Sequence, residues 1–209
     1  DLWVATRTKG LALIKDSAIN KQALQLRSFT IQNSLVANNN VHQVLKDSRG
    51  WLWLGYQGEG IQIIKNPNEW INGQAANIQL LKNDGAEKSL NSNSIRKLYE
   101  DNAGNIWVAT TDNGINYVTV IGENISSVQV FESNSTSNFQ RSHKDARGVY
   151  QQQDSTYWVA SYGGGITKYE LGSNELLKLR TTEGLPNNSV YGILGDENPD
   201  FIWMSTNSG

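Results

Sequence analysis

The chain has 209 residues, of which 38% are hydrophobic and 18% are charged. This composition is that of a soluble globular protein, and no apolar run approaches the roughly 18 residues that a membrane helix needs. A net charge of −2 provides no basic surface for nucleic acid or for an anionic membrane, so we expect neither partner. Because the chain contains no Cys, thiolate catalysis, disulfides and Cys-based metal sites are excluded.

A phrase built around a Trp recurs along the whole chain. Four copies place a Gly seven residues after the Trp, and in a shorter fifth copy Gly209 follows after six residues. The copies read LWVATRTKGL at Leu2–Leu11, LWLGYQGEGI at Leu52–Ile61, NIWVATTDNGI at Asn105–Ile115, YWVASYGGGI at Tyr157–Ile166 and IWMSTNSG at Ile202–Gly209. Successive Trp residues lie 50, 54, 51 and 45 positions apart, and this regular spacing indicates a repeat protein.

A short apolar strand and an Asp-containing turn precede four of these copies. In chain order they read NNVHQVLKDSRGW at 39–51, NSIRKLYEDNAGN at 93–105, DARGVYQQQDSTY at 145–157 and NSVYGILGDENPDF at 188–201. Asp with a nearby Gly is typical of a tight turn, because Asx-type hydrogen bonds begin the turn and Gly accepts positive φ. We therefore predict hairpins in which the backbone engages the side chains of Asp47, Asp101 and Asp154.

Two further runs follow each Trp strand and complete a unit of four predicted strands. The third run lies at 11–14, 61–64, 115–120 and 166–171, and the more variable fourth run lies at 24–31, 78–82, 128–131 and 177–182. No segment shows a helical period, and Asn66–Asn77 is polar enough to be a long loop. Four short antiparallel strands in every 45–54 residues are typical of one blade of a β-propeller.

We therefore predict an all-β fold, a β-propeller with four-stranded antiparallel blades that is incomplete in this chain. Three blades are expected to be nearly complete and two partial, with blade parts at about 1–33, 41–82, 95–132, 147–182 and 190–209. Because the chain starts and stops inside copies of its own repeat, we expect a fragment of a longer chain. Trp107 is predicted to be buried between neighbouring blades, where a large rigid side chain fills the gap. Exposure of Trp3 or Trp203 would be less telling, because each lies in an incomplete blade.

The repeated pattern resembles the two-component regulator propeller repeat. It combines an apolar strand, an Asp turn with Gly, a Leu or Ile before the Trp, a small residue, a polar loop and a final Gly. The copies at Val41–Ile61 and Ile95–Ile115 match this pattern well. Those at Val149–Ile166 and Val190–Gly209 match less completely, because the turn Gly is missing from the former and DENPDF replaces the turn in the latter.

The resemblance implies a sensor region of a bacterial membrane receptor. In that family the propellers usually precede a β-sandwich, a membrane helix and a cytoplasmic output module, commonly a histidine kinase and in some relatives a diguanylate cyclase. The chain is accordingly expected in the periplasm, beside further blades and a β-sandwich of its parent chain, with a homodimer as an expected assembly. The stretch Glu183–Glu197 looks like the blade that often closes the propeller region, which implies the C-terminal part of the sensor.

The sequence shows no catalytic constellation, metal site or cofactor site, so we predict none of the three. His42 and His143 lie far apart in sequence and lack a clustered set of partners, so we interpret both as solvated or hydrogen-bonded loop residues. Gly163–Gly165 lies between two strands rather than before a helix, which favours a repeat loop over a phosphate site. A propeller enzyme such as a lyase or glycosidase is the alternative, and a protein-interaction scaffold is a third reading.

The loops between each Trp strand and the next strand carry the residues that we favour for ligand binding. In a propeller these loops open on one face, where amides, carboxylates and rings converge on a central funnel. Such a set suits a small polar ligand such as an oligosaccharide, because Gln57 and Asn113 offer both donors and acceptors to hydroxyl groups. The predicted ligand-binding residues are Arg7, Gln57, Glu59, Asp112, Asn113 and Tyr162.

Overall fold

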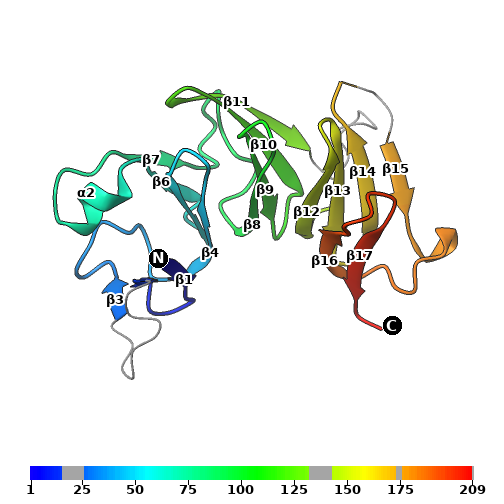
Figure 1. The fold of residues 1–209 in the computed structure, drawn as a ribbon, viewed down its shortest axis with the longest axis horizontal. Helices are drawn as coiled ribbons and strands as arrows, with labels where there is room; N and C mark the ends of the chain where they lie inside the picture. The colour runs from blue at the N-terminus through cyan, green and yellow to red at the C-terminus, as the bar shows by residue number, and fades with distance from the viewer. Residues whose placement is uncertain (16–25, 132–142, 173–175, 209) are drawn as a thin grey trace.

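A computed structural model describes residues 1–15, 26–131, 143–172 and 176–208. Within this part the chain forms five antiparallel sheets that follow one another in chain order (Figure 1). The first sheet has three strands, the next three have four strands each, and the last has two. The predicted fold is therefore confirmed, an all-β incomplete propeller with three four-stranded blades and two partial ones.

Each sheet is a meander of consecutive antiparallel strands. The first sheet contains β1 (Leu2–Ala5), β2 (Leu11–Ile14) and β3 (Leu26–Phe29). The second contains β4 (Val41–Lys46), β5 (Leu52–Tyr56), β6 (Ile61–Ile64) and β7 (Ile78–Leu81). The third contains β8 (Ile95–Glu100), β9 (Ile106–Thr110), β10 (Ile115–Ile121) and β11 (Asn124–Phe131). The fourth contains β12 (Ala146–Gln153), β13 (Thr156–Ser161), β14 (Gly165–Glu170) and β15 (Leu176–Leu179), and the fifth contains β16 (Val190–Gly195) and β17 (Ile202–Thr206).

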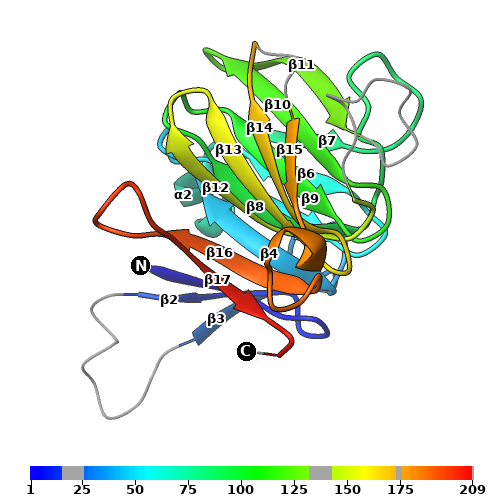
Figure 2. The same ribbon diagram turned by 90° about the vertical axis from the view of Figure 1, so that its right-hand side faces the viewer.

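The sheets fan out in an open arc with their first strands on the inner side. The first strands β4, β8, β12 and β16 contact one another in this order, so they line a common axis. The fourth strands β7, β11 and β15 lie toward the outside of the arc (Figures 1 and 2). Because the chain reverses at each hairpin, the loops between second and third strands and the connections between sheets share one face of the arc, the loop face. The hairpins between first and second strands lie on the opposite, hairpin face.

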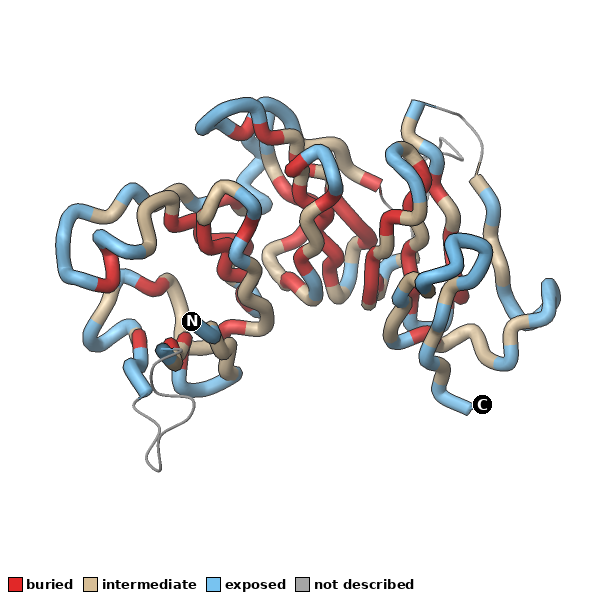
Figure 3. The backbone as a smooth tube through the Cα atoms, in the orientation of Figure 1, coloured by how far each residue is buried: buried red, intermediate tan, exposed pale blue. Residues whose placement is uncertain are grey.

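The hydrophobic core lies between successive sheets, and buried segments concentrate in the second, third and fourth sheets (Figure 3). Trp107 is 0% exposed, and its ring centroid lies 4.6 Å from those of Tyr117 in its own sheet and Tyr157 in the next sheet. The predicted burial of Trp107 between blades is therefore confirmed. The equivalent Trp203 is 64% exposed, because no further strand of the described residues covers the last sheet.

Small residues two positions after the Trp allow neighbouring sheets to approach closely. Gly55 lies on β5, and a Cβ built on it would be 2.7 Å from Cγ2 of Ile95 in the next sheet. Ile95 is fully buried, so the missing side chain at Gly55 is what admits it between the sheets. The small residue of the repeat is therefore part of the contact between blades.

The interval Asn66–Asn77 differs from the predicted long loop. It contains helix α2 (Pro67–Ile71), which begins with Pro in its first turn, a position where the missing N–H is harmless. Trp70 and Ile71 are buried, and the Trp70 ring stacks on Phe29 of the first sheet with centroids 4.5 Å apart. The prediction of no helix is wrong here because these two apolar side chains anchor one short turn. A single 3₁₀ turn, η1, follows β15 at Thr181–Glu183, and residues 24 and 25 of the predicted fourth run lie outside the described residues.

Candidate functional site

The loop face is held together by one repeated backbone hydrogen bond. In four successive sheets the Gly that ends the loop after the Trp strand donates its N–H to a carbonyl just before the next sheet's first strand. The pairs are Gly10–Asn39, Gly60–Asn93 and Gly114–Lys144 at 2.9 Å and Gly165–Asn188 at 2.8 Å. Each loop is thereby fixed to the connection that enters the next blade, so the loop face presents a continuous surface around the axis.

The geometry of this contact explains the Gly of the repeat. Gly60 has a φ of +71°, a conformation that L side chains rarely adopt. A Cβ at Gly60 would also lie 2.5 Å from the carbonyl oxygen of Leu81 on the fourth strand. The position therefore needs Gly both for its dihedral angle and for the close approach of the outer strand.

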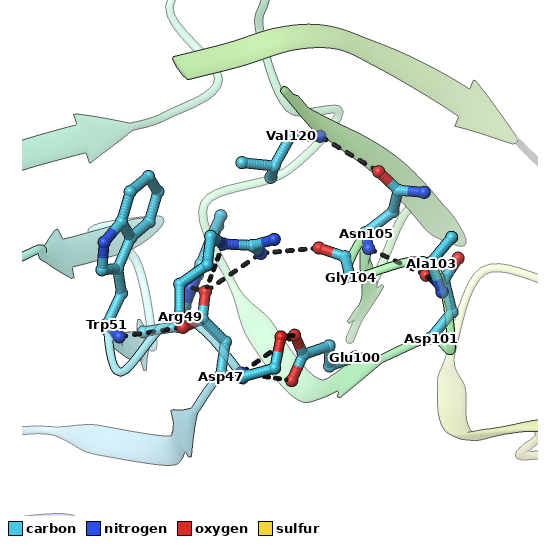
Figure 4. Close-up of polar contacts among 11 residues, drawn as sticks. Asp47, Arg49, Trp51, Glu100, Asp101, Ala103, Gly104, Asn105 and Val120 are labelled. Carbon is cyan, nitrogen blue, oxygen red and sulfur yellow. Dashed lines mark hydrogen bonds and ion pairs between the residues drawn. The ribbon is translucent and has the colours of Figure 1, made fainter. Parts of the chain in front are cut away.

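The hairpin face is occupied by its own polar network (Figure 4). The Asp47 carboxylate accepts the Trp51 backbone N–H at 2.8 Å and the Trp53 indole N–H at 2.9 Å. The Asp101 carboxylate likewise accepts two backbone N–H groups of its turn and the hydroxyls of Tyr117 and Tyr157. Both carboxylates are thus used inside the fold, as the turn pattern predicts.

Neighbouring hairpins are also joined to one another. Arg49 of the second sheet donates to the carbonyl oxygen of Gly104 in the third sheet at 2.6 Å, and the Ser48 hydroxyl donates to the Glu100 carboxylate at 2.5 Å (Figure 4). Asp154 departs from the prediction, because its side chain is exposed and engages no backbone donor among the described residues. The hairpin face thus holds mainly structural contacts.

The axis of the loop face is lined by one equivalent residue from each of four sheets. In every first strand the pairing register shifts by one residue near its start, so that the second residue is the extra residue of a β-bulge. A bulge re-aims the side chain that it carries and is common beside functional sites. We name these four residues the bulge row: His42, Arg96, Arg147 and Tyr191.

Arg147 occupies the most elaborate part of the bulge row. Its Nη2 lies 2.7 Å from a carboxylate oxygen of Asp145. Its guanidinium carbon lies 4.9 Å from the ring centroid of Tyr162 and 5.5 Å from that of Tyr191, and the two rings are 5.8 Å apart. A guanidinium that faces aromatic rings keeps its N–H edge available for a planar acceptor. Tyr162 and Tyr191 are 44% and 42% exposed, so both rings are accessible from the loop face.

Positive charge accumulates beside this aromatic pair. Burial lowers the pKa of the Arg96 guanidinium most, and the charge of Arg147 lowers it further. The Asp145 carboxylate raises this pKa, and Arg7 lowers it by a smaller amount. Burial, then Arg7 and Arg96, also lowers the pKa of His42, whose imidazole is therefore neutral at pH 7. His42 is thus a half-buried residue of a strand rather than the loop residue that we predicted. Both Arg7 and Arg147 thus act on Arg96, and Asp145 is the ion-pair partner of Arg147.

Several buried polar atoms at this end of the sheets have no hydrogen-bond partner among the described residues. They include Nε of Arg96, Nε of Arg147, one carboxylate oxygen of Asp145 and the hydroxyl of Ser161. Ser161 is 1% exposed and lies opposite Ala146, next to the bulge. Buried donors and acceptors are nearly always paired in native proteins, so such a group of unpaired atoms marks a site where a ligand or water is expected.

The six residues predicted for ligand binding divide into three groups. Arg7 and Tyr162 lie beside the bulge row: the positive charge of Arg7 acts on Arg96, and the ring of Tyr162 contacts Arg147. Gln57 and Asp112 are exposed on the rim of the loop face. Glu59 forms an ion pair with Lys82 at 2.7 Å, and the amide of Asn113 donates to the Asn91 carbonyl oxygen at 2.7 Å.

The sequence reasoning missed Arg96, Arg147 and Tyr191. The signal that could have found them is their equivalent position, directly after the first apolar residue of each first strand. Among the described residues no group of three or more His, Cys, Asp or Glu side chains is placed to hold a metal ion. Over the same residues, no helix is long and apolar enough to cross a membrane.

These features define an incomplete β-propeller with a cationic and aromatic site at the axis of its loop face. A family model described as two component regulator propeller matches residues 89–112, which cover β8, β9 and part of the following loop. The chain therefore carries a two component regulator propeller repeat in its third sheet, and the resemblance seen in the sequence is confirmed. No curated protein sequence matches the chain.

Solved structures with the same fold include extracellular domains of proposed bacterial one and two component systems. The extracellular domain of a proposed hybrid two component system from B. thetaiotaomicron has a TM-score of 0.74 at 17% identity, over 99% of this chain and 26% of that one. A proposed one component system from the same organism gives 0.68 at 16% identity, over 98% and 24%. PorZ, a surface component of the type-IX secretion system of Porphyromonas gingivalis, gives 0.69 at 13% identity, over 98% and 29%. The chain spans about a quarter of the length of each.

Proposed function

We propose that this chain is part of the extracytoplasmic sensor region of a bacterial signal-transduction receptor, located in the periplasm. The observation that carries the proposal is the two component regulator propeller repeat at residues 89–112. The fold similarity to extracellular domains of proposed one and two component systems supports it over nearly the whole chain. A histidine kinase, commonly of the hybrid type, is the proposed output module of the parent protein.

Within this proposal the loop face receives a small polar ligand such as an oligosaccharide. Arg7 and Tyr162 contact it beside the bulge row, Gln57 and Asp112 contact it from the exposed rim, and Glu59 and Asn113 hold the loops in place while offering their remaining polar atoms. The hairpin face suits a ligand less well, because Asp47 and Asp101 are already engaged. Further blades, a β-sandwich of the same parent chain and a second receptor copy are the proposed neighbours.

The test uses the complete natural protein in membrane vesicles, exposed to hydrolysates of several purified polysaccharides. We expect at least one hydrolysate to change the rate of autophosphorylation, and Tyr162→Ala to reduce that response. Phe201→Ala is the matched control, because Phe201 is also an exposed aromatic residue but lies at the hairpin of the last sheet. Formation of cyclic di-GMP instead of phosphotransfer would assign a cyclase output. A parent protein with neither activity would refute the proposed function.

A further inference from the structure

The bulge row brings two guanidinium groups, those of Arg96 and Arg147, near the carboxylate of Asp145. Arg147 disfavours the charged state of Arg96, whereas the Asp145 carboxylate favours it and also pairs with Arg147 at 2.7 Å. Arginine stays protonated in proteins, so the two positive charges persist side by side. The single Asp145 carboxylate thus serves two guanidinium groups, and a second anion would balance the remaining positive charge.

The buried atoms without hydrogen-bond partners also indicate that an anion binds here. Nε of Arg96 and Nε of Arg147 are buried donors without acceptors among the described residues. The hydroxyl of Ser161, opposite Ala146, and one carboxylate oxygen of Asp145 are unpaired as well. A carboxylate provides two acceptor oxygens in one plane and pairs with guanidinium donors more strongly than a neutral acceptor does. These donors therefore favour an anionic ligand over the neutral sugar that the sequence alone suggested.

The aromatic residues narrow the choice of anion. The Arg147 guanidinium lies over the rings of Tyr162 and Tyr191, and these two residues remain 44% and 42% exposed, so aromatic surface lies next to the cationic centre. Aromatic side chains supply a large rigid contact area with a polar tip, which suits a ligand that carries both C–H faces and hydroxyls. An acidic sugar combines such a ring with a carboxylate.

We propose that the bulge row binds the acidic group of an acidic oligosaccharide, with Arg96 and Arg147 as its cationic partners and the rings of Tyr162 and Tyr191 against the sugar. This inference rests on the proposed function, whose ligand class it specifies. Asp145 then acts as a positioning residue, because its ion pair holds the Arg147 guanidinium between the two rings. Arg7 adds positive charge near Arg96.

Titration calorimetry on the complete natural protein tests the inference with trigalacturonate and its methyl ester. The two probes share one sugar backbone and differ in whether the carboxyl groups are ionised or carry a methyl group, so their comparison needs no variant. We expect trigalacturonate to bind at least 10-fold more tightly than the ester, in a salt-dependent manner, because hydrogen bonds to charged groups contribute about 10- to 100-fold in affinity. Equal affinity for acid and ester, or no binding of either at millimolar concentration, would overturn the inference.

Charge-removing variants then locate the site. Arg96→Gln and Arg147→Gln should each weaken trigalacturonate binding about 10- to 100-fold and leave the affinity for the ester nearly unchanged. Arg27→Gln is the control, because it removes the same charge from an exposed position on the outer strand β3. Equal losses in the control, or unchanged affinity in both bulge-row variants, would contradict the assignment. If a Gln variant does not fold, Arg96→Lys keeps the charge and should retain part of the acid preference.

Inorganic sulfate separates recognition of an acidic sugar from general anion binding. As a competitor of trigalacturonate, it should act only at concentrations far above those of the sugar, because it lacks the ring that contacts the tyrosines. Competition by sulfate at equal concentration would contradict the sugar assignment. A positive binding result without any kinase or cyclase response would refute the proposed receptor function and leave the acidic-ligand site intact, so the two failures are distinguishable.

Discussion

Replacing Trp107 by Ala tests whether the contact between blades holds the fold together. Trp107 is 0% exposed and contacts Tyr117, Phe131 and Tyr157 with ring centroids 4.6–5.7 Å apart. Removing about 200 Å² of buried apolar surface at about 25 cal/mol per Å² corresponds to about 5 kcal/mol. Measured Trp and Phe to Ala changes in cores fall at about 3–5 kcal/mol, so we expect a loss in that range.

The assay is urea unfolding of the complete natural protein, followed by far-ultraviolet circular dichroism. With a slope of about 2–3 kcal/mol per M, a loss of about 4 kcal/mol lowers the midpoint by about 1.3–2 M. Trp203→Ala provides the matched control at the same position of the repeat, where the side chain is 64% exposed in the described structure. A loss below about 1 kcal/mol for Trp107→Ala would refute the account of blade packing. A Trp203→Ala loss as large as that of Trp107→Ala would show that further chain covers the last sheet.

Three further perturbations follow from the same structure. Gly60→Ala should lower the unfolding free energy by more than about 2 kcal/mol, because the new Cβ clashes with the outer strand and the φ is unfavourable. Gly58→Ala is its control: the φ is also positive but the space is open, so the loss should be about 1 kcal/mol. Asp47→Ala should lose about 2–4 kcal/mol, because it leaves buried hairpin donors unpaired; the exposed Asp154→Ala should change stability by less than about 0.5 kcal/mol in the same urea assay. The pKa of His42 is lowered in the folded state, so below about pH 6.5 unfolding takes up a proton. The stability that the neutral His42 contributes is therefore present above pH 6.5 and is lost as the pH falls through the folded pKa. His42→Gln should therefore reduce the loss of stability between about pH 7 and 5, and an unchanged pH profile would contradict the assignment.

The structural features most readily predicted from the sequence are those in which one residue type has the same role in every repeat. The Trp fills the gap between sheets, the Gly accepts a positive φ against the fourth strand, and the Asp organises its hairpin. Because the same physical demand recurs, each copy supports the interpretation of the others. Asp154 shows the limit, since its turn lacks Gly and its side chain lies in solvent.

Helix α2 was not predictable from periodicity. Five residues make little more than one turn, too short for a 3.6-residue pattern to appear in the sequence. Its stability comes from Trp70, which stacks on Phe29 about forty positions earlier in the chain. Pro67 at the start was the one local signal, and a polar interval around it concealed the two buried side chains.

The candidate site could be predicted only in part from the sequence, because a β-bulge depends on how two strands pair. Reading the first strands for their apolar residues passed over Arg96 and Arg147, which stand between those residues at the bulged positions. Glu59 and Asn113 illustrate the converse, since their loop positions suggested free polar groups, whereas Lys82 and Asn91 engage them. Pairwise contacts of this kind arise only when the chain has folded.

The central claim is that the bulge row of the loop face receives the acidic group of a ligand. A crystal structure of the complete natural protein with trigalacturonate tests it most directly. We expect one sugar carboxylate within about 3 Å of the guanidinium groups of Arg96 and Arg147, with sugar rings against Tyr162 and Tyr191. Trigalacturonate bound on the hairpin face, or on the loop face without contact to either arginine, would contradict the account.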